Sequence, residues 1–183
     1  MAKYTYAELC GKKDRELEEI FSAGKTPELK NLLGSEFRGF NVPIITKVLG
    51  MQKFKKGFFV GPGQKVESGE VMGFNVLIKQ GVNDQWPALP SEDAPKRFGF
   101  YRVAKVKPEE KDNKYPHALL LNYGISRNGI HPARLLRDYL VQVEPDNPNL
   151  YLGRAYFALG PLRVFPSFFV LERYNPIKGE IGY

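Results

Sequence analysis

The fold is decided by Arg137-Asp138-Tyr139-Leu140-Val141-Gln142-Val143 and by the two segments that follow this run, up to Tyr174. A strand has a period of two, which places Arg137, Tyr139, Val141 and Val143 on one face of the run. The second segment, Leu150 to Leu159, alternates in the same way. The third, Val164 to Tyr174, concentrates phenylalanine and aliphatic residues, so we expect it to be covered on both sides, Phe165 included.

Strong turn signals separate these three segments. Pro145-Asp146-Asn147-Pro148-Asn149 lies between the first and the second, and Gly160-Pro161 lies between the second and the third. Proline presets φ, and glycine or asparagine tolerates positive φ, which suits tight connections. Because such short connections join neighbouring strands, we predict an antiparallel meander.

The same two-residue period recurs upstream, after Gly34. It predicts further strands at residues 35–41, 53–60, 70–80, 97–106 and 118–123, and residues 86–89 are either a short strand or an irregular segment. In the fourth of these, Phe98, Phe100 and Arg102 are expected to share a face. Helix is expected mainly near the start, at residues 14–23 and 26–33, with single turns at 43–49 and 131–135 and a hairpin connection at 61–69.

Eight or nine strands without alternating helices predict a mainly β protein. The meander order favours a single antiparallel up-and-down β-barrel with short N-terminal helices over a two-sheet sandwich. A chain of 183 residues has the length of one domain. We therefore expect one domain over residues 1–183, with a helical segment at 1–34, the barrel at 35–175 and a tail at 176–183.

The formal charge of +7 is spread along the chain, with 11 basic against 7 acidic residues up to residue 60 and 16 against 13 after it. Small clusters occur at Lys53-Lys55-Lys56 and Lys96-Arg97, but no block resembles a basic arm. Nucleic-acid binding is therefore not the favoured interpretation. No run approaches the roughly 20 apolar residues of a spanning helix, and Cys10 is the only cysteine, so a cytoplasmic location is expected.

Leu33-Gly34-Ser35-Glu36-Phe37-Arg38-Gly39, placed after a helix, resembles the start of the calycin superfamily, which includes the lipocalins and fatty-acid-binding proteins. The nearest likeness is to small bacterial proteins with a Gly-x-Trp-x-Gly domain. Asp138-Tyr139 to Val143 and the run Phe168 to Arg173 resemble their later strands. This chain departs from the motif, because Phe37 takes the place of the tryptophan and the glycines are five apart, one more than the motif allows.

The resemblance implies a barrel with at most a small-ligand role. In such barrels the motif aromatic stacks on a late-strand arginine, which implies a contact of Phe37 with Arg154 or Arg173. The other interpretation is a surface arginine beside a core phenylalanine.

Polar side chains interrupt the apolar strands and are the candidates for ligand binding. An inward arginine would require an anionic or strong acceptor partner, with Arg102 and Arg154 the best candidates, whereas outward arginines would be ordinary solvent-face residues. The expected partner is a small hydrophobic and possibly anionic molecule, such as a fatty acid or isoprenoid. The candidate residues are Arg102, Arg154, Tyr139, Asn75, Phe37 and Arg38.

Two other classes of function stay open. An isomerase or cyclase in the same barrel would use Tyr139 or His117 as acid or base, and a haem-dependent barrel would use His117 as axial ligand. A nucleic-acid-binding module would use basic strands and exposed aromatic side chains. The sequence contains no zinc motif and no nucleophile elbow, so no metal site and no cofactor are assigned.

Overall fold

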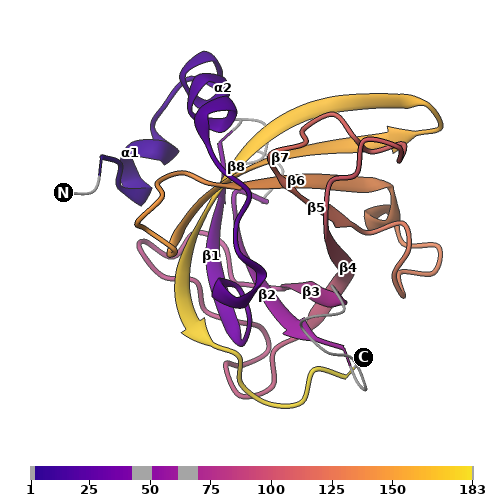
Figure 1. Ribbon diagram of the computed structural model, residues 1–183. Helices are drawn as coiled ribbons and strands as arrows, with labels where there is room; N and C mark the ends of the chain where they lie inside the picture. Colours follow the sequence, from indigo (N-terminus) through magenta and orange to yellow (C-terminus); the bar gives the residue numbers. More distant parts are fainter. Residues whose placement is uncertain (1–2, 43–50, 62–69, 183) are drawn as a thin grey trace.

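A computed structural model describes residues 3–42, 51–61 and 70–182. Eight antiparallel strands close into one barrel, in which each strand pairs with the next and β8 pairs back with β1 (Figure 1). This confirms the predicted mainly β up-and-down barrel. The strands are β1 (Ser35–Asn41), β2 (Lys53–Val60), β3 (Val71–Val76), β4 (Arg97–Lys105), β5 (Leu119–Asn122), β6 (Leu136–Gln142), β7 (Leu150–Leu159) and β8 (Leu162–Pro176).

Short helices lie beside the barrel near the N-terminus (Figure 1). Helix α2 (Asp14–Ala23) has the predicted bounds, whereas the helix expected at 26–33 is reduced to one 3₁₀ turn, η1 (Leu29–Asn31). Helix α1 (Tyr6–Cys10) was not predicted, and a capping box between Thr5 and Glu8 starts it. A further 3₁₀ turn in the described residues, η3 (Pro132–Leu135), confirms the turn expected before β6.

Two expected features lie largely outside the described residues: the helical turns at 43–49 and most of the connection at 61–69. Within the described ranges, no helix has the length and apolar character needed to cross a membrane.

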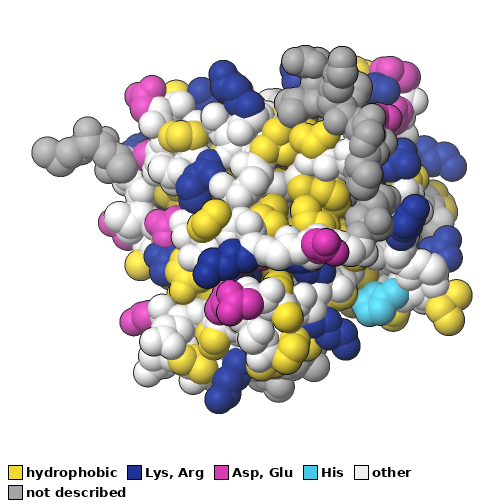
Figure 2. Space-filling model, turned by 90° about the horizontal axis from the view of Figure 1, so that it is seen from below, with side chains coloured by type: hydrophobic (Ala, Val, Ile, Leu, Met, Phe, Trp, Pro, Cys, Tyr) yellow, Lys and Arg dark blue, Asp and Glu magenta, His cyan; other side chains and the backbone are white. Residues whose placement is uncertain are grey.

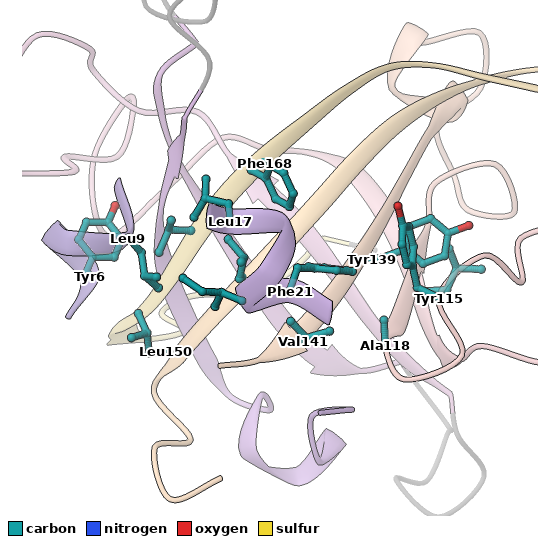
Figure 3. Packing of buried hydrophobic residues seen from close by; sticks show 14 of the residues in the cluster. Tyr6, Leu9, Leu17, Phe21, Tyr115, Ala118, Tyr139, Val141, Leu150 and Phe168 are labelled. Carbon is teal, nitrogen blue, oxygen red and sulfur yellow. The ribbon is translucent and has the colours of Figure 1, made fainter. Parts of the chain in front are cut away.

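Apolar side chains pack in two layers, one inside the barrel and one against its outer face. The inner layer includes Phe37, Phe58 and Tyr151. In the outer layer, Phe21 of α2 packs edge-on to Phe168 of β8, with ring centroids 6.2 Å apart (Figure 3). Because helices and loops cover part of the outer face, the middle of β8 is buried on both sides, as predicted. Phe165 is an exception, since it lies near the β7–β8 turn with 74% of its surface exposed.

One end of the barrel is closed by Phe37, which has no exposed surface. The Arg173 guanidinium lies 5.1 Å from the centre of the Phe37 ring. Arg173 is held there by Asn149 Oδ1, 2.7 Å from its Nε, and by Ser35 Oγ and the Asn31 carbonyl. Of the two arginines proposed for this contact, the structure therefore places Arg173 and not Arg154 on Phe37.

A bulge in β4 reorients its first aromatic residue. Gly73 pairs with Tyr101 while Asn75 pairs with Phe98, so two residues of β4 stand opposite one residue of β3. Gly99, at the bulge, has a φ of +55°. Phe98 consequently lines the barrel cavity, whereas Phe100 packs in the outer layer. The prediction that Phe98, Phe100 and Arg102 share one face was wrong, because it assumed an unbroken two-residue period.

Candidate functional site

The barrel contains a cavity of about 310 Å³ toward the end opposite Phe37. Its position follows from the strand segments that line it, which are the end of β3, the starts of β2, β4 and β6, and the turn-side half of the β7–β8 hairpin. Most of the wall is apolar or aromatic. The lining side chains of that kind include Phe54, Phe98, Leu136, Ala155, Phe157 and Phe169.

Four polar residues form the floor of this cavity, and we call them the polar floor: Lys56, Asn75, Tyr123 and Asp138. Lys56 Nζ lies 3.0 Å from Asp138 Oδ2, and each of these two side chains is only 4% exposed. Lys56 also donates to Asn75 Oδ1 at 3.0 Å and to the Tyr123 hydroxyl. The Tyr123 hydroxyl in turn donates to Asp138 Oδ2 at 3.0 Å.

The polar floor joins opposite sides of the barrel. Lys56 comes from β2 and Asp138 from β6, while Asn75 is in β3 and Tyr123 directly follows β5. Asn75 also donates to the Gly99 carbonyl at 3.2 Å, so the bulge that turns Phe98 inward is tied to the same network. The hydrogen bonds therefore fix the relative positions of β2, β3, β4, β6 and the end of β5 below the cavity.

Aromatic rings surround the Lys56 ammonium group. Its Nζ lies 5.0 Å from the ring centre of Tyr101, 5.1 Å from that of Tyr123 and 5.4 Å from those of Phe54 and Phe169. These distances are within the range of cation–π attraction. The rings and the Asp138 carboxylate together replace the water that an exposed ammonium group would have.

Burial changes the acid–base properties of the site. It lowers the pKa of Lys56, while the nearby Asp138 carboxylate acts in the opposite direction and favours the charged amine. Burial raises the pKa of Tyr123 well above its usual value, and Asp138 adds to this rise. Three acceptors around Nζ match the three protons of an ammonium group, so the geometry fits a Lys56–Asp138 ion pair with a neutral Tyr123.

The candidate residues named from the sequence are dispersed over the barrel. Asn75 belongs to the polar floor, and Phe37 lies inside the barrel at its closed end. Arg38 lies on the outer face, where its Nε donates to Glu172 at 2.7 Å and its guanidinium lies over Tyr6.

The remaining three candidates also face away from the cavity. Arg102 is exposed on β4. Arg154 forms an ion pair with Glu18 of α2 and lies over the Phe168 ring. Tyr139 packs edge-on against Tyr115 in the outer layer. Arg102 is therefore a solvent-face residue, whereas Arg154 also lies outside the barrel cavity but is covered by α2 and only 16% exposed.

The two histidines are also remote from the polar floor. His117 lies 3.2 Å from the Phe21 carbonyl of α2, and His131 accepts from the Ala133 amide as the N-cap of η3. Neither histidine is among the described residues that line the cavity. In the described part of the chain, no group of three His, Cys, Asp or Glu side chains has a metal-binding arrangement.

Three residues of the polar floor, Lys56, Tyr123 and Asp138, were not predicted as site residues from the sequence. The available signal was a charged residue in phase with apolar neighbours on the same strand face. Lys56 alternates with Phe54 and Phe58, and Asp138 alternates with Leu136 and Leu140. Opposite charges on the inner faces of two strands predict a pair only when the barrel brings those strands together.

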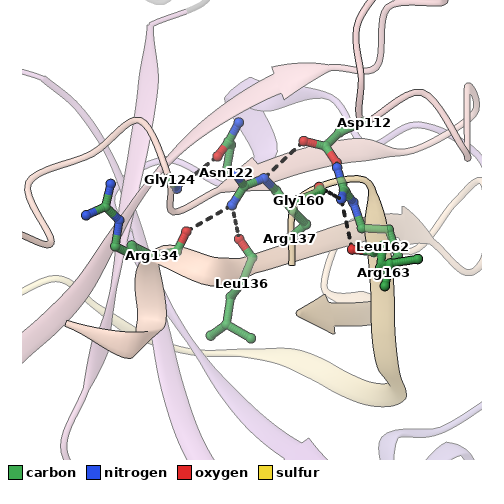
Figure 4. Close-up of polar contacts among 9 residues, drawn as sticks. All are labelled: Asp112, Asn122, Gly124, Arg134, Leu136, Arg137, Gly160, Leu162 and Arg163. Carbon is green, nitrogen blue, oxygen red and sulfur yellow. Dashed lines mark hydrogen bonds and ion pairs between the residues drawn. The ribbon is translucent and has the colours of Figure 1, made fainter. Parts of the chain in front are cut away.

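A second charged cluster lies on the outer surface. Asp112, in the loop between β4 and β5, accepts from Arg137 Nε at 3.0 Å and from Arg163 Nε at 2.9 Å (Figure 4). Arg137 also donates to the carbonyls of Arg134 and Leu136. Because the contacts of this cluster tie a loop to β6 and β8, we interpret it as structural.

Comparisons with protein-family models, with curated proteins and with solved structures give no significant match.

Proposed function

We propose that the protein binds a small, predominantly apolar molecule in the barrel cavity. The observation that carries this proposal is the combination of an apolar wall with a few convergent polar groups at the floor, which is the usual composition of small-molecule sites. The volume of about 310 Å³ is at the lower end of the range for such sites. An eight-stranded barrel has room for one small ligand of this kind.

The calycin resemblance supports the same proposal. The chain forms an eight-stranded up-and-down barrel, and Arg173 stacks on Phe37 as the resemblance implies. Under this proposal the protein is a calycin-like binding protein, and its expected location remains cytoplasmic.

Nucleic-acid binding has less support. In the cluster Lys53-Lys55-Lys56, Lys55 is fully buried against Glu36 and Glu92, and Lys56 belongs to the polar floor. These two lysines are therefore inaccessible to phosphate groups. On the face seen in Figure 2, basic side chains are scattered among acidic and apolar ones and form no continuous stripe.

A second candidate function is proton-transfer catalysis in the same cavity. It is favoured by the convergence of three titratable side chains, Lys56, Tyr123 and Asp138, at one end of an apolar pocket. The structure supports these residues for this role in place of Tyr139 and His117. The test is the rate at which the protein exchanges the α-protons of an unsaturated ketone with deuterated solvent. A rate equal to that of solvent alone would exclude it for that substrate class.

The binding proposal is tested by filling the cavity. Ala155 lines it, so Ala155→Trp is expected to abolish binding of an environment-sensitive apolar dye and of any molecule that native mass spectrometry detects on the purified protein. Ala104→Trp makes the same substitution at an exposed position of β4 and serves as the matched control.

Circular dichroism shows whether the two variants are folded. If Ala155→Trp does not fold, Ser167→Leu replaces it, because Ser167 lines the same cavity. Equal dye affinities of a folded cavity variant and the control would contradict the proposal.

A further inference from the structure

The two carboxylate oxygens of Asp138 have different surroundings. Oδ2 accepts from Lys56 Nζ and from the Tyr123 hydroxyl, both at 3.0 Å. Oδ1 is buried and has no hydrogen-bond partner among the described residues, although Asp138 lines the cavity. A buried carboxylate oxygen without a donor is unfavourable, so this atom requires a partner that the described protein residues do not supply.

The donors of the polar floor are already used. The three protons of the Lys56 ammonium group match its three acceptors, which are Asn75 Oδ1, the Tyr123 oxygen and Asp138 Oδ2. The Tyr123 hydroxyl donates to Asp138, and the Asn75 amide donates to Gly99 and Tyr123. Among the described residues, the floor therefore has one unused acceptor, Asp138 Oδ1, and no unused donor.

Two polar side chains at the rim, Gln80 and Lys53, already donate to backbone carbonyls. Gln80 Nε2 donates to the Lys53 carbonyl at 2.7 Å, and Lys53 Nζ donates to the Val82 carbonyl at 2.7 Å. Lys53 is the described lysine at the mouth of the cavity, and it also lies over the Trp86 ring. An anion attracted to Lys53 would stay at the rim, with its apolar part directed toward the floor.

We propose that the ligand carries a neutral hydrogen-bond donor, in the simplest case a hydroxyl group, and donates it to Asp138 Oδ1. This inference rests on the proposed binding function of the cavity. A carboxylate head would face the Asp138 carboxylate without an available donor at the floor, and an ammonium head would add a second buried cation beside Lys56. The ligand class is then an apolar alcohol or phenol, and not the fatty acid expected from the sequence.

A matched set of bicyclic probes tests the inference on the unmodified protein. Naphthol has the donor, its methyl ether keeps the oxygen but has no donor, naphthalene has neither, and naphthoate and naphthylmethylamine add a negative or a positive charge. We expect calorimetry to show naphthol binding about tenfold or more tightly than its methyl ether, because a hydrogen bond to a charged group has this magnitude. Naphthoate and the amine are expected to bind more weakly than naphthol.

Asp138→Asn gives a sharper test. Lys56 and Tyr123 both donate to the Oδ2 position, so the amide oxygen is expected there, and the amide nitrogen then replaces Oδ1. The floor now offers a donor that the oxygen of either probe can accept, so the preference for naphthol over its methyl ether is expected to be lost. Circular dichroism shows whether the variant is folded. If it does not fold, the ratio of the affinities of the unmodified protein for naphthol and for its methyl ether decides whether the ligand donates a hydrogen bond.

The outcomes separate the two proposals. Similar affinities for naphthol, its ether and naphthalene would leave a binding cavity but overturn the donor inference. Tightest binding of naphthoate or of the amine would overturn it as well, in favour of a charged ligand. If no probe binds and the apolar dye also fails to bind, the binding function itself is refuted, and this inference with it.

Discussion

Removing one partner of the Lys56–Asp138 pair is expected to destabilise the barrel more than removing both. The two charges are 3.0 Å apart, and each side chain is 4% exposed. At an effective dielectric constant of about 20, this separation corresponds to an attraction of about 5 kcal/mol, which the desolvation of two buried ions largely offsets. Lys56→Met leaves a buried carboxylate without its cation, so its expected cost is about 3 to 5 kcal/mol in the free energy of unfolding.

Adding Asp138→Asn to Lys56→Met removes the uncompensated charge while keeping an acceptor for Tyr123. The free energy of unfolding of the double variant should therefore be at least about 1 kcal/mol higher than that of Lys56→Met alone, and so closer to the wild-type value. Urea unfolding followed by far-ultraviolet circular dichroism measures these differences, and the fluorescence of Trp86, the only tryptophan, gives an independent signal.

An exposed ion pair provides the control for this cycle. Lys107 and Glu110 are also 3.0 Å apart, but their side chains are 58% and 53% exposed. The corresponding cycle, Lys107→Met with Glu110→Gln, is expected to show no measurable coupling, because solvent screens such pairs. Additive losses at Lys56 and Asp138 would refute the view that the two residues form one buried ionic unit.

Two further predictions concern aromatic residues. Phe37→Ala should lower the free energy of unfolding by about 3 to 5 kcal/mol in the same urea assay, because it leaves a cavity under Arg173; a loss below about 1 kcal/mol would show that the site collapses. Burial raises the pKa of Tyr101 and Tyr123 well above 10.0, so their ionisation in an absorbance titration should accompany unfolding. The unfolded chain releases these tyrosine protons at a lower pH than the folded protein does, so the free energy of unfolding should decrease as the pH rises above 10.5. This range also lies above the ordinary pKa of lysine, where Lys56 no longer contributes to the pH dependence. Ionisation of both tyrosines in the folded protein would contradict this prediction.

The regular strands were predictable because their period and their turn signals agree. The bounds of β2, β7 and α2 follow from the sequence to the residue, since glycine, proline or a change of period marks their limits. Helix α1 was missed because five residues are too short to show a helical period. The bulge at Gly99 was missed because a lone glycine in a strand does not show whether the strand continues in phase.

The site was harder to predict than the fold because it depends on contacts between distant strands. Lys56 and Asp138 are 82 positions apart in the numbering, and each strand alone shows a charge in phase with apolar neighbours but not the partner of that charge. Arg102 and Arg154 looked equally suitable as internal charges. Only the pairing register and the position of helix α2 show that these arginines face outward.

The pairing of β1 with β8 has a consequence for how the molecule assembles. Seven of its eight strand pairings join consecutive strands, whereas the eighth joins Phe40 to Val170 across nearly the whole barrel sequence. Hairpins can form locally, but pairing β1 with β8 requires a large loss of chain entropy. Until this pairing forms, β1 and β8 each have an unpaired edge. We therefore expect an aggregation-sensitive interval during refolding, and pulse-labelling of amide hydrogens should find β1 and β8 protected last.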